Sequence, residues 1–366
     1  MKSRFIERLD AAIEASGNSF QRSCLNLEKA SYLARRGDTL ESEMIISSVR
    51  SDGQYLLSGE VSTWLNFAEG MQLHCTGSDT DARQKWMRAL AIARAASARA
   101  MMARILSWLG FLHYTSINTE LLVANTRHAT DCMMKNDFEA IARTNLTIAQ
   151  IFHLCGNAMK ARDFYDRCRL ACVNSSDDVM LAALIHNMAW LRMSLQRNEI
   201  LQGVPTTEDR YMVEVSAEST RSYEGLIGAK SRDVMTPLLG AQVDIISERY
   251  HDAILAIDEN LGSIGAQGLS RLNSVLIADR AYCRANIGDI DGAKFDALSA
   301  RESISDGDHV DDLAILYARL SRVYELAGDK EIAAVYSSNA NALWQKFRLI
   351  QDNLIARIDE FAGFDL

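Results

Sequence analysis

Apolar residues recur every three or four positions through most of this chain, which is the spacing of one face of an α-helix. The clearest run begins after Lys330 and predicts one long amphipathic helix. Its apolar positions are Ala333, Tyr336, Ala340, Leu343, Phe347, Ile350, Leu354, Ile358 and Phe361. Only two prolines, Pro205 and Pro237, occur in 366 residues, and proline inside a helix costs about 3 kcal/mol. The pattern therefore predicts an all-α protein.

A small residue returns on these predicted helices at intervals of 40, 40, 39, 40, 52, 40 and 40 residues. The positions are Ala30, Gly70, Gly110, Ala149, Ala189, Ala241, Ala281 and Ser321. A second small residue usually follows twelve positions later, at Ser42, Ala82, Ala161, Ala253, Ala293 and Ala333, with Leu122 as an exception. Closely packed helices need small side chains where their axes approach. A fixed period of this kind predicts a right-handed superhelical solenoid of about eight helical hairpins.

Glycine followed by a polar residue separates the two predicted helices in most units. These pairs are Gly37-Asp38, Gly77-Ser78, Gly156-Asn157, Gly288-Asp289 and Gly328-Asp329. Glycine ends a helix in the left-handed conformation, and a polar side chain can cap the next helix. We therefore expect the chain to change helix at each of these positions.

The fifth interval of 52 residues places about a dozen extra residues between Ala189 and Ala241. Helix breakers lie between Arg197 and Asp209, and the segment up to Ala229 can again be helical. We expect an insertion over about residues 197–229. Two interpretations remain open: a surface loop followed by an extended helix, or a hinge or lid across a groove, because solenoid insertions tend to lie on one face.

The regular array is expected to cover residues 19–345, preceded by an N-terminal capping helix over residues 1–18. Residues 346–366 would form the end of the long C-terminal helix. A solenoid must cover its terminal apolar face, and the second half of this helix can do so. The alternative is a homodimer formed through this helix as a coiled coil, because the apolar stripe is longer than one repeat covers.

The last unit carries the most complete motif. It comprises Tyr317, Leu320, Ser321 and Tyr324 on one helix face, the turn Gly328-Asp329, and then Ala333 and Ala340. This pattern resembles the tetratricopeptide repeat, and partial matches extend the resemblance over about residues 20–345. The period is longer than the family's usual length of about 34 residues. In this respect the chain is similar to bacterial regulatory tetratricopeptide proteins, which include peptide-sensing receptors and the helical arms of transcription activators.

The resemblance implies that the first helix of each hairpin lines a concave groove. Carrying this over by spacing places groove residues six and three positions before each small residue, and one and four positions after it. Polar and aromatic residues gather in the middle of this set, with Asn187 at its margin: Arg143, Gln150, His153, His186, Asn187, Trp190, Gln242 and Tyr282. Amides can bond a peptide backbone, aromatic rings can cover its side chains, and arginine can bind a carboxylate. The alternative for each residue is a satisfied position in the core between helices.

These observations predict a non-catalytic regulatory scaffold that binds a peptide or protein segment. The net charge is −9 and the basic residues are dispersed, so we expect no nucleic-acid partner. We expect a cytoplasmic protein that does not enter a membrane, because the N-terminus lacks a signal-peptide core and no apolar run reaches about 20 residues. The seven cysteines are expected to be thiols in helical core positions.

No enzyme, metal or cofactor motif stands out in the sequence. Cys168 and Cys172 are one helical turn apart but alternate with apolar core positions, whereas zinc sites need four converging ligands. His74 and Cys75 are adjacent on a predicted helix, so their side chains point about 100° apart. We therefore expect no catalytic residue, no metal ligand and no cofactor.

A different class of function remains open at the end of the chain. The segment from Arg357 to Leu366 closes a long helix with a short Asp-Leu tail. It is similar to the linker that enters a GGDEF-type diguanylate cyclase domain, although the Thr-Gly-Leu that continues that motif is missing. The alternative function is therefore a sensory module that controls a signalling output, such as a diguanylate cyclase or a transcription regulator.

Overall fold

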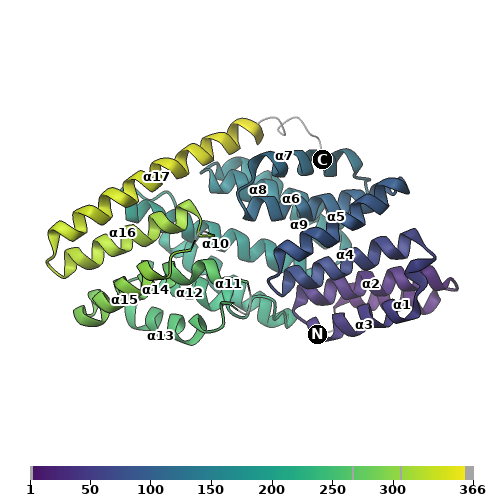
Figure 1. Ribbon diagram of the computed structural model, residues 1–366, viewed down its shortest axis with the longest axis horizontal. Helices are drawn as coiled ribbons and strands as arrows, with labels where there is room; N and C mark the ends of the chain where they lie inside the picture. The colour runs from purple at the N-terminus through teal and green to yellow at the C-terminus, as the bar shows by residue number, and fades with distance from the viewer. Residues whose placement is uncertain (1–2, 266–267, 306, 359–366) are drawn as a thin grey trace. The chain divides into compact units, whose positions relative to one another are not determined.

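A computed structural model describes residues 3–265, 268–305 and 307–358, and these residues form helices and turns without a strand (Figure 1). The prediction of an all-α protein is confirmed. The seventeen α-helices of the described residues are α1 (Arg4–Ala15), α2 (Ser19–Arg36), α3 (Thr39–Asp52), α4 (Gly59–Cys75), α5 (Asp79–Ala95), α6 (Arg99–Thr115), α7 (Thr119–Cys132), α8 (Phe138–Leu154), α9 (Ala158–Ser175), α10 (Asp178–Gln202), α11 (Arg210–Ile227), α12 (Met235–Ile246), α13 (Tyr250–Leu261), α14 (Asn273–Asn286), α15 (Ile290–Glu302), α16 (Val310–Leu326) and α17 (Lys330–Ile358). Short 3₁₀ turns lie at Gln54–Leu56 and Ser270–Leu272.

Helices pack in the neighbouring pairs that the period predicts. The contacting pairs are α2 with α3, α4 with α5, α6 with α7, α8 with α9, α12 with α13, and α14 with α15. First helices of successive pairs also contact each other, as α2 with α4, α6 with α8, and α14 with α16. Each small residue that set the period lies in the first helix of its pair and is buried. The packing is therefore compatible with a helical repeat.

The turns between helices confirm the five glycine positions. Gly37, Gly77, Gly156, Gly288 and Gly328 have φ values of 94°, 86°, 76°, 89° and 82°. The turn after α6 has Ile117 at φ 53°, and the turn after α12 has Glu248 at φ 61°. These two residues adopt the left-handed conformation that glycine occupies elsewhere. The same turn geometry thus occurs without the glycine that signals it in sequence.

The extra residues of the fifth interval lengthen a helix and add a loop. Helix α10 continues through Arg197 to Gln202, so the helix extends into the segment that holds the predicted breakers. Residues 203–209 form the loop, and α11 follows from Arg210 to Ile227. A loop followed by a helix corresponds to the first of the two interpretations given by the sequence.

The described helices divide between two compact units. The first comprises the described parts of 1–185, 222–232 and 354–366, and the second comprises 186–221 and 233–353. The sequence pattern separates only an array from its two ends and gives no sign of this division. Helix α17 confirms the predicted long C-terminal helix up to Ile358, and Phe361 and the Asp-Leu tail lie outside the described residues.

The first unit joins its first hairpin to a segment far along the chain. Arg35 of α2 forms a buried ion pair with Asp177, with 2.9 Å between Nη1 and Oδ2. The Tyr32 hydroxyl donates a hydrogen bond to Asp178 at the start of α10. The backbone N–H of Lys230 donates to the carbonyl oxygen of Arg36 at 2.8 Å. In an open solenoid each repeat contacts only its neighbours, so these contacts close the first unit on itself.

All seven cysteines are free thiols, and Cys24, Cys168, Cys172 and Cys283 are buried. Cys168 and Cys172 lie in the hydrophobic core of the first unit, as their apolar pattern predicts. No helix among the described residues combines the length and the apolar character that crossing a membrane would need.

The close approach of paired helices is tightest at Gly70. A Cβ atom placed there would lie 2.5 Å from Cδ1 and Nε1 of Trp86 on α5. The Trp86 ring is fully buried, and its Nε1 donates a hydrogen bond to the Phe67 carbonyl at 3.1 Å. A Cβ atom placed on Gly110 would have Oγ1 of Thr126 as its nearest neighbour, at 3.1 Å. Gly70 therefore tolerates a methyl group less well than Gly110 does.

We predict that Gly70→Ala destabilises the first unit by about 1–3 kcal/mol through overpacking against Trp86. Gly110→Ala should cost less, because the Thr126 hydroxyl can move and alanine favours the helix by about 1 kcal/mol. Urea unfolding of both variants beside the wild type measures the difference. Equal midpoints for the two variants would show that the helix approach at Gly70 does not limit the packing.

Candidate ligand-binding cavity

The second unit contains a cavity of about 710 Å³. Its wall comes from the end of α10, the loop 203–209, the start of α11, the α12–α13 turn, α14 and α16. The lining residues are Gln196, Arg197, Ile200, Thr206, Thr207, Glu208, Asp209, Arg210, Ile245, Ile246, Glu248, Tyr250, Tyr282 and Arg319. This volume lies within the range of about 300–1,000 Å³ that small-molecule and cofactor sites occupy. The inserted segment therefore contributes a large part of a ligand-sized cavity.

A chain of buried polar side chains runs behind the cavity wall. Arg197 Nη1 donates to Gln242 Oε1 at 3.0 Å, and Gln242 Nε2 donates to Asp279 Oδ2 at 2.6 Å. Arg319 Nε donates to the other carboxylate oxygen of Asp279 at 2.7 Å. All four residues are buried. Each of these four side chains thus bonds to a side chain from a different helix, as is usual for buried polar residues.

In this chain the Asp279 carboxylate bonds to Arg319 directly and to Arg197 through the Gln242 amide, and the cavity wall as a whole carries three arginines and three carboxylates. Burial lowers the pKa of the Arg197 guanidinium, and the Asp279 carboxylate opposes this shift. Arg319 lies over the Tyr282 ring with its Cζ atom 4.4 Å from the ring centroid. Tyr282 in turn contacts Tyr250 edge to face, with 5.9 Å between centroids. The wall can therefore present both cationic and aromatic groups to a ligand.

Two buried polar atoms on residues that line the cavity have no hydrogen-bond partner among the described residues, and neither atom is accessible from the cavity. Arg197 Nε and Gln196 Oε1 are both buried without one, although Gln196 Nε2 donates to the Glu208 carbonyl at 3.2 Å. A buried donor or acceptor left without a partner costs about 1–3 kcal/mol. One unused donor and one unused acceptor therefore lie on successive residues of α10.

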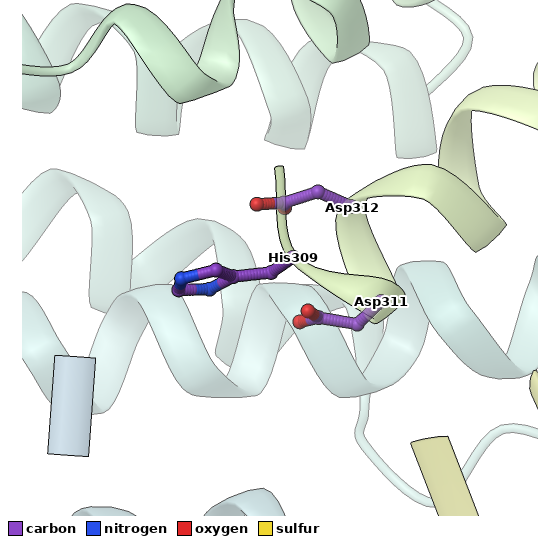
Figure 2. A group of neighbouring side chains, drawn as sticks. All are labelled: His309, Asp311 and Asp312. Carbon is purple, nitrogen blue, oxygen red and sulfur yellow. The ribbon is translucent and has the colours of Figure 1, made fainter. Parts of the chain in front are cut away.

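A second group in this unit has the geometry of metal ligands. His309, Asp311 and Asp312 lie at the start of α16, and their ligand atoms are all within 4.8 Å of one another (Figure 2). Figure 2 shows the two carboxylates on either side of the imidazole. Arg271 already donates to Asp312, and Arg197 adds a second nearby positive charge. Carboxylates are also stabilised by the positive end of the helix dipole, which lies at the N-terminus of a helix. The sequence indicated no metal ligand here. Asp311 and Asp312 form the acidic first turn of α16, and its N-cap residue His309 makes no capping hydrogen bond.

Three of the predicted groove residues belong to the first unit and are buried. Arg143, Gln150 and His153 are only 3%, 4% and 3% exposed. Arg143 Nη2 donates to Gln150 Oε1 at 3.2 Å, and His153 Nδ1 lies 3.0 Å from the Tyr165 hydroxyl. The expectation that these side chains are exposed in a groove is wrong. The closure of the first unit through Arg35 and Asp177 fills its interior with side chains.

The Arg143 side chain is closely surrounded by other side chains in the interior of the first unit. Its Cζ atom lies 4.1 Å from the Phe111 ring centroid and 5.3 Å from that of Trp108. Burial lowers the pKa of Arg143 to about 10. Trp108 Nε1 donates to Glu139, which also pairs with Arg104 at 3.0 Å. Arg143 thus packs against aromatic rings instead of facing solvent.

The remaining predicted groove residues belong to the second unit and differ in their exposure and contacts. His186 is 1% exposed, with its Nδ1 3.5 Å from the Thr236 hydroxyl. Asn187 and Trp190 are half-buried, and Trp190 stacks on His186 with 6.1 Å between centroids. Gln242, 1% exposed, bonds in the chain behind the cavity wall.

Tyr282 lines the cavity and is half-buried. It is the residue of the predicted set that the structure places at the candidate site. The expected exposure is therefore wrong for the five buried residues, namely Arg143, Gln150, His153, His186 and Gln242. A role of the set in binding a peptide stays a prediction.

The groove offsets select neither Arg197 nor Arg319, and they do not select Asp279. Asp279 and Arg319 both stand two positions before the small residue of their repeat, Ala281 and Ser321. Since successive first helices contact each other, this position faces the next repeat, where the two charges meet. The shared offset and the opposite charges are the sequence signal that could have identified this pair.

No protein-family model matches the chain, and no match is found among curated proteins. The tetratricopeptide resemblance therefore depends on the repeat motif alone. The candidate site has to be interpreted from its own residues.

We predict that Asp279→Ala destabilises the protein by about 3–5 kcal/mol, because it leaves Arg319 buried without its carboxylate. The double variant Asp279→Ala with Arg319→Met should lose less than the sum of the two single losses, since neither buried charge then lacks a partner. Urea unfolding of the three variants gives this coupling energy. Additive losses would show that the Asp279–Arg319 contact is not energetically coupled.

Asp312 makes stability depend on pH. Burial and the neighbouring Asp311 carboxylate raise the pKa of Asp312 from 3.8 to about 6, although Arg271 and His309 oppose this. The folded protein binds this proton more tightly than the unfolded chain, so the contribution is present below pH 4 and lost as pH rises through 6. We predict that the free energy of unfolding of the wild type falls by about 1–3 kcal/mol between pH 4 and pH 7 through this group. The Asp312→Asn variant should not show this fall. Unfolding measured across this range, with the exposed Asp252→Asn as a control, tests the slope.

Proposed function

We propose that this protein is a non-catalytic regulatory scaffold that binds a peptide or protein segment in the cavity of its second unit. The observation that carries the proposal is the combination of a ligand-sized cavity of about 710 Å³ with a mixed wall. Guanidinium groups, threonine hydroxyls, isoleucines and tyrosines line it together. Such a mixture suits a peptide, which offers backbone polar groups and side chains in the same short stretch.

The inserted segment supports this assignment. The loop 203–209 supplies Thr206, Thr207, Glu208 and Asp209 to the wall. The Glu199 carboxylate accepts hydrogen bonds from the backbone N–H and the hydroxyl of Thr207, at 2.8 Å and 2.7 Å. The loop is therefore tied to α10 at Thr207, while residues 203–207 are exposed. An insertion in a helical repeat commonly carries its binding surface.

The wall chemistry favours binding over catalysis. Among the described residues that line the cavity there is no histidine or cysteine. The two buried arginines are engaged with Gln242 and Asp279. The Thr207 hydroxyl has a carboxylate within hydrogen-bond reach, that of Glu199, and this bond holds the loop to α10. A recognition role is the simpler use of these groups.

The repeat motif extends the proposal to architecture and cellular setting. We infer a tetratricopeptide-like, right-handed superhelical array that acts in the cytoplasm, with the paired helices and their turns as support. Free thiols at all seven cysteines are consistent with a reducing compartment.

A display library of random peptides selected on the purified protein tests the binding proposal. We predict that Thr206→Trp, which fills the cavity from its exposed loop, weakens the selected peptides by at least about tenfold, as loss of an interface hot spot does. Ser219→Trp is the matched control, because Ser219 is exposed on α11 of the same unit and does not line the cavity. The proposal fails if no peptide is enriched, or if both variants bind the selected peptides as the wild type does.

A further inference from the structure

The second helices of the last three hairpins expose large apolar side chains at one shared position. Two residues after the buried small residue of each helix stand Leu255 on α13, Phe295 on α15 and Val335 on α17. These residues are 61%, 68% and 60% exposed. Leu298 and Ile332, which are 45% and 44% exposed, lie on the same faces of α15 and α17, because steps of three residues keep to one helix face. We call these five residues the apolar stripe.

We infer that the apolar stripe is a second binding surface, which receives a lysine- and arginine-rich amphipathic helix of a protein partner. This inference does not depend on the proposed function, because none of the five residues lines the cavity. It follows from the exposure of the apolar stripe, from the charges that flank it, and from its restriction to the last three hairpins.

Carboxylates flank the apolar stripe on all three helices. Five exposed acidic residues stand three or four positions from a member of the apolar stripe, and thus on the same helix faces. None of them forms an ion pair within the described part of the chain: Asp252, Glu259, Asp291, Glu302 and Glu331. Over residues 250–261, 290–302 and 330–342, these faces carry no lysine or arginine. The exposed apolar side chains therefore lie among unpaired negative charges.

Ion pairs within the second unit connect the helices that carry the apolar stripe. Arg280 of α14 binds Asp258 on α13 and Asp296 on α15, at 2.5 Å and 2.8 Å. Lys294 of α15 binds Asp329, in the turn before α17, with 2.7 Å between Nζ and Oδ2. The nearby cations are therefore already engaged with other carboxylates. They leave the five flanking carboxylates available to a partner.

The first unit lacks this combination on α5 and α9. The residues two positions after the small residues of these helices are Gln84 and Asp163, which are polar. Basic residues share the same faces, with Arg88 on α5 and Lys160 on α9. The acidic and apolar surface is therefore a local feature of the second unit, and the net charge of −9 does not account for it.

A basic amphipathic helix matches both properties of this surface. Its apolar face would cover the apolar stripe and remove it from water, and its lysines and arginines would pair with the flanking carboxylates. A second copy of the chain that docked through the same face would bring carboxylates against carboxylates, which is unfavourable. An anionic membrane surface would be repelled for the same reason.

Isothermal titration calorimetry of synthetic peptides on the full chain tests the inference. The probe is an amidated leucine–lysine peptide of about 16 residues, long enough to form a helix, with its leucines on one face. We expect a Kd of about 100 µM or tighter at low salt. A scrambled peptide, with its leucines spread around the helix, should bind at least about tenfold more weakly. A peptide with glutamate in place of lysine should not bind, because it meets like charge.

Phe295→Ser removes the most exposed member of the apolar stripe. This variant should weaken the probe by at least about fivefold, as loss of an aromatic anchor does. Leu170→Ser is the matched control, since Leu170 is 62% exposed on α9 of the first unit. Its affinity for the probe should equal that of the wild type.

A triple variant tests the contribution of the charges. It reverses one carboxylate in the first turn of each of the three helices, with the substitutions Asp252→Lys, Asp291→Lys and Glu331→Lys. We expect it to weaken the probe by at least about tenfold. The control makes the same change in net charge in the first turns of α3, α5 and α7, with Glu41→Lys, Asp81→Lys and Glu120→Lys. Because both triple variants lose first-turn carboxylates, a loss of affinity confined to the first identifies the surface.

The remaining outcomes overturn the inference in distinguishable ways. Binding that Thr206→Trp weakens and Phe295→Ser leaves unchanged places the probe in the cavity, which leaves the proposed function intact. Equal binding of the probe and the scrambled peptide shows that charge alone attracts them. Equal affinities of the two triple variants, or no binding of the probe at millimolar concentration, also overturn the inference. Self-association of the wild type in sedimentation that Phe295→Ser abolishes shows that the apolar stripe joins two copies instead.

Discussion

Close approach of paired helices is the constraint on which the repeated packing depends. Each first helix carries a small residue at its buried face, and at Gly70 even one methyl group would meet the Trp86 ring. Because these residues recur every 40 positions in most units, equivalent faces of successive first helices meet at the same offset. Asp279 and Arg319 form their 2.7 Å contact for this reason. The spacing that permits helix packing therefore also determines which charges are paired.

The two units use similar hairpins with different results. In the first unit the contact between Arg35 and Asp177 closes the interior, where arginines, carboxylates and aromatic rings pack together. In the second unit the longer α10 and the loop after it lie beside a cavity. Buried polar groups are costly unless they are paired. Both units hold buried polar atoms without a partner among the described residues, at Arg35 and Arg143 as at Arg197, so the feature that distinguishes the second unit is its cavity.

Local structure could be predicted from the sequence because helical spacing, small residues and glycine turns are local signals. The turns at Gly37, Gly77 and Gly288 follow directly from them. The turns at Ile117 and Glu248 carry no such signal, since the surrounding helices impose the left-handed conformation on ordinary residues. The prediction of a solvent-exposed groove through Arg143 and His153 was wrong for a different reason. It assumed an open array, and the closing contact depends on residues separated by 142 positions.

The candidate site could be predicted only in part. The position of the insertion followed from the 52-residue interval, and Tyr282 was selected through the groove offsets. Arg197 was not selected, because it lies two turns beyond the small residue Ala189, in the stretch assigned to breakers. That α10 continues to Gln202 is decided by packing, which outweighs local propensity.

The closure of the first unit also affects the order in which the chain can fold. During synthesis the first hairpin leaves the ribosome long before Asp177 and Asp178, which lie 142 and 146 residues beyond their partners, and before Lys230, which bonds to Arg36. Arrays with only neighbour contacts can fold from any repeat. Here the early hairpin must wait for distant segments, and contacts of long sequence separation slow folding. The first unit should therefore acquire its native stability only after residue 230 has been translated, as one cooperative step.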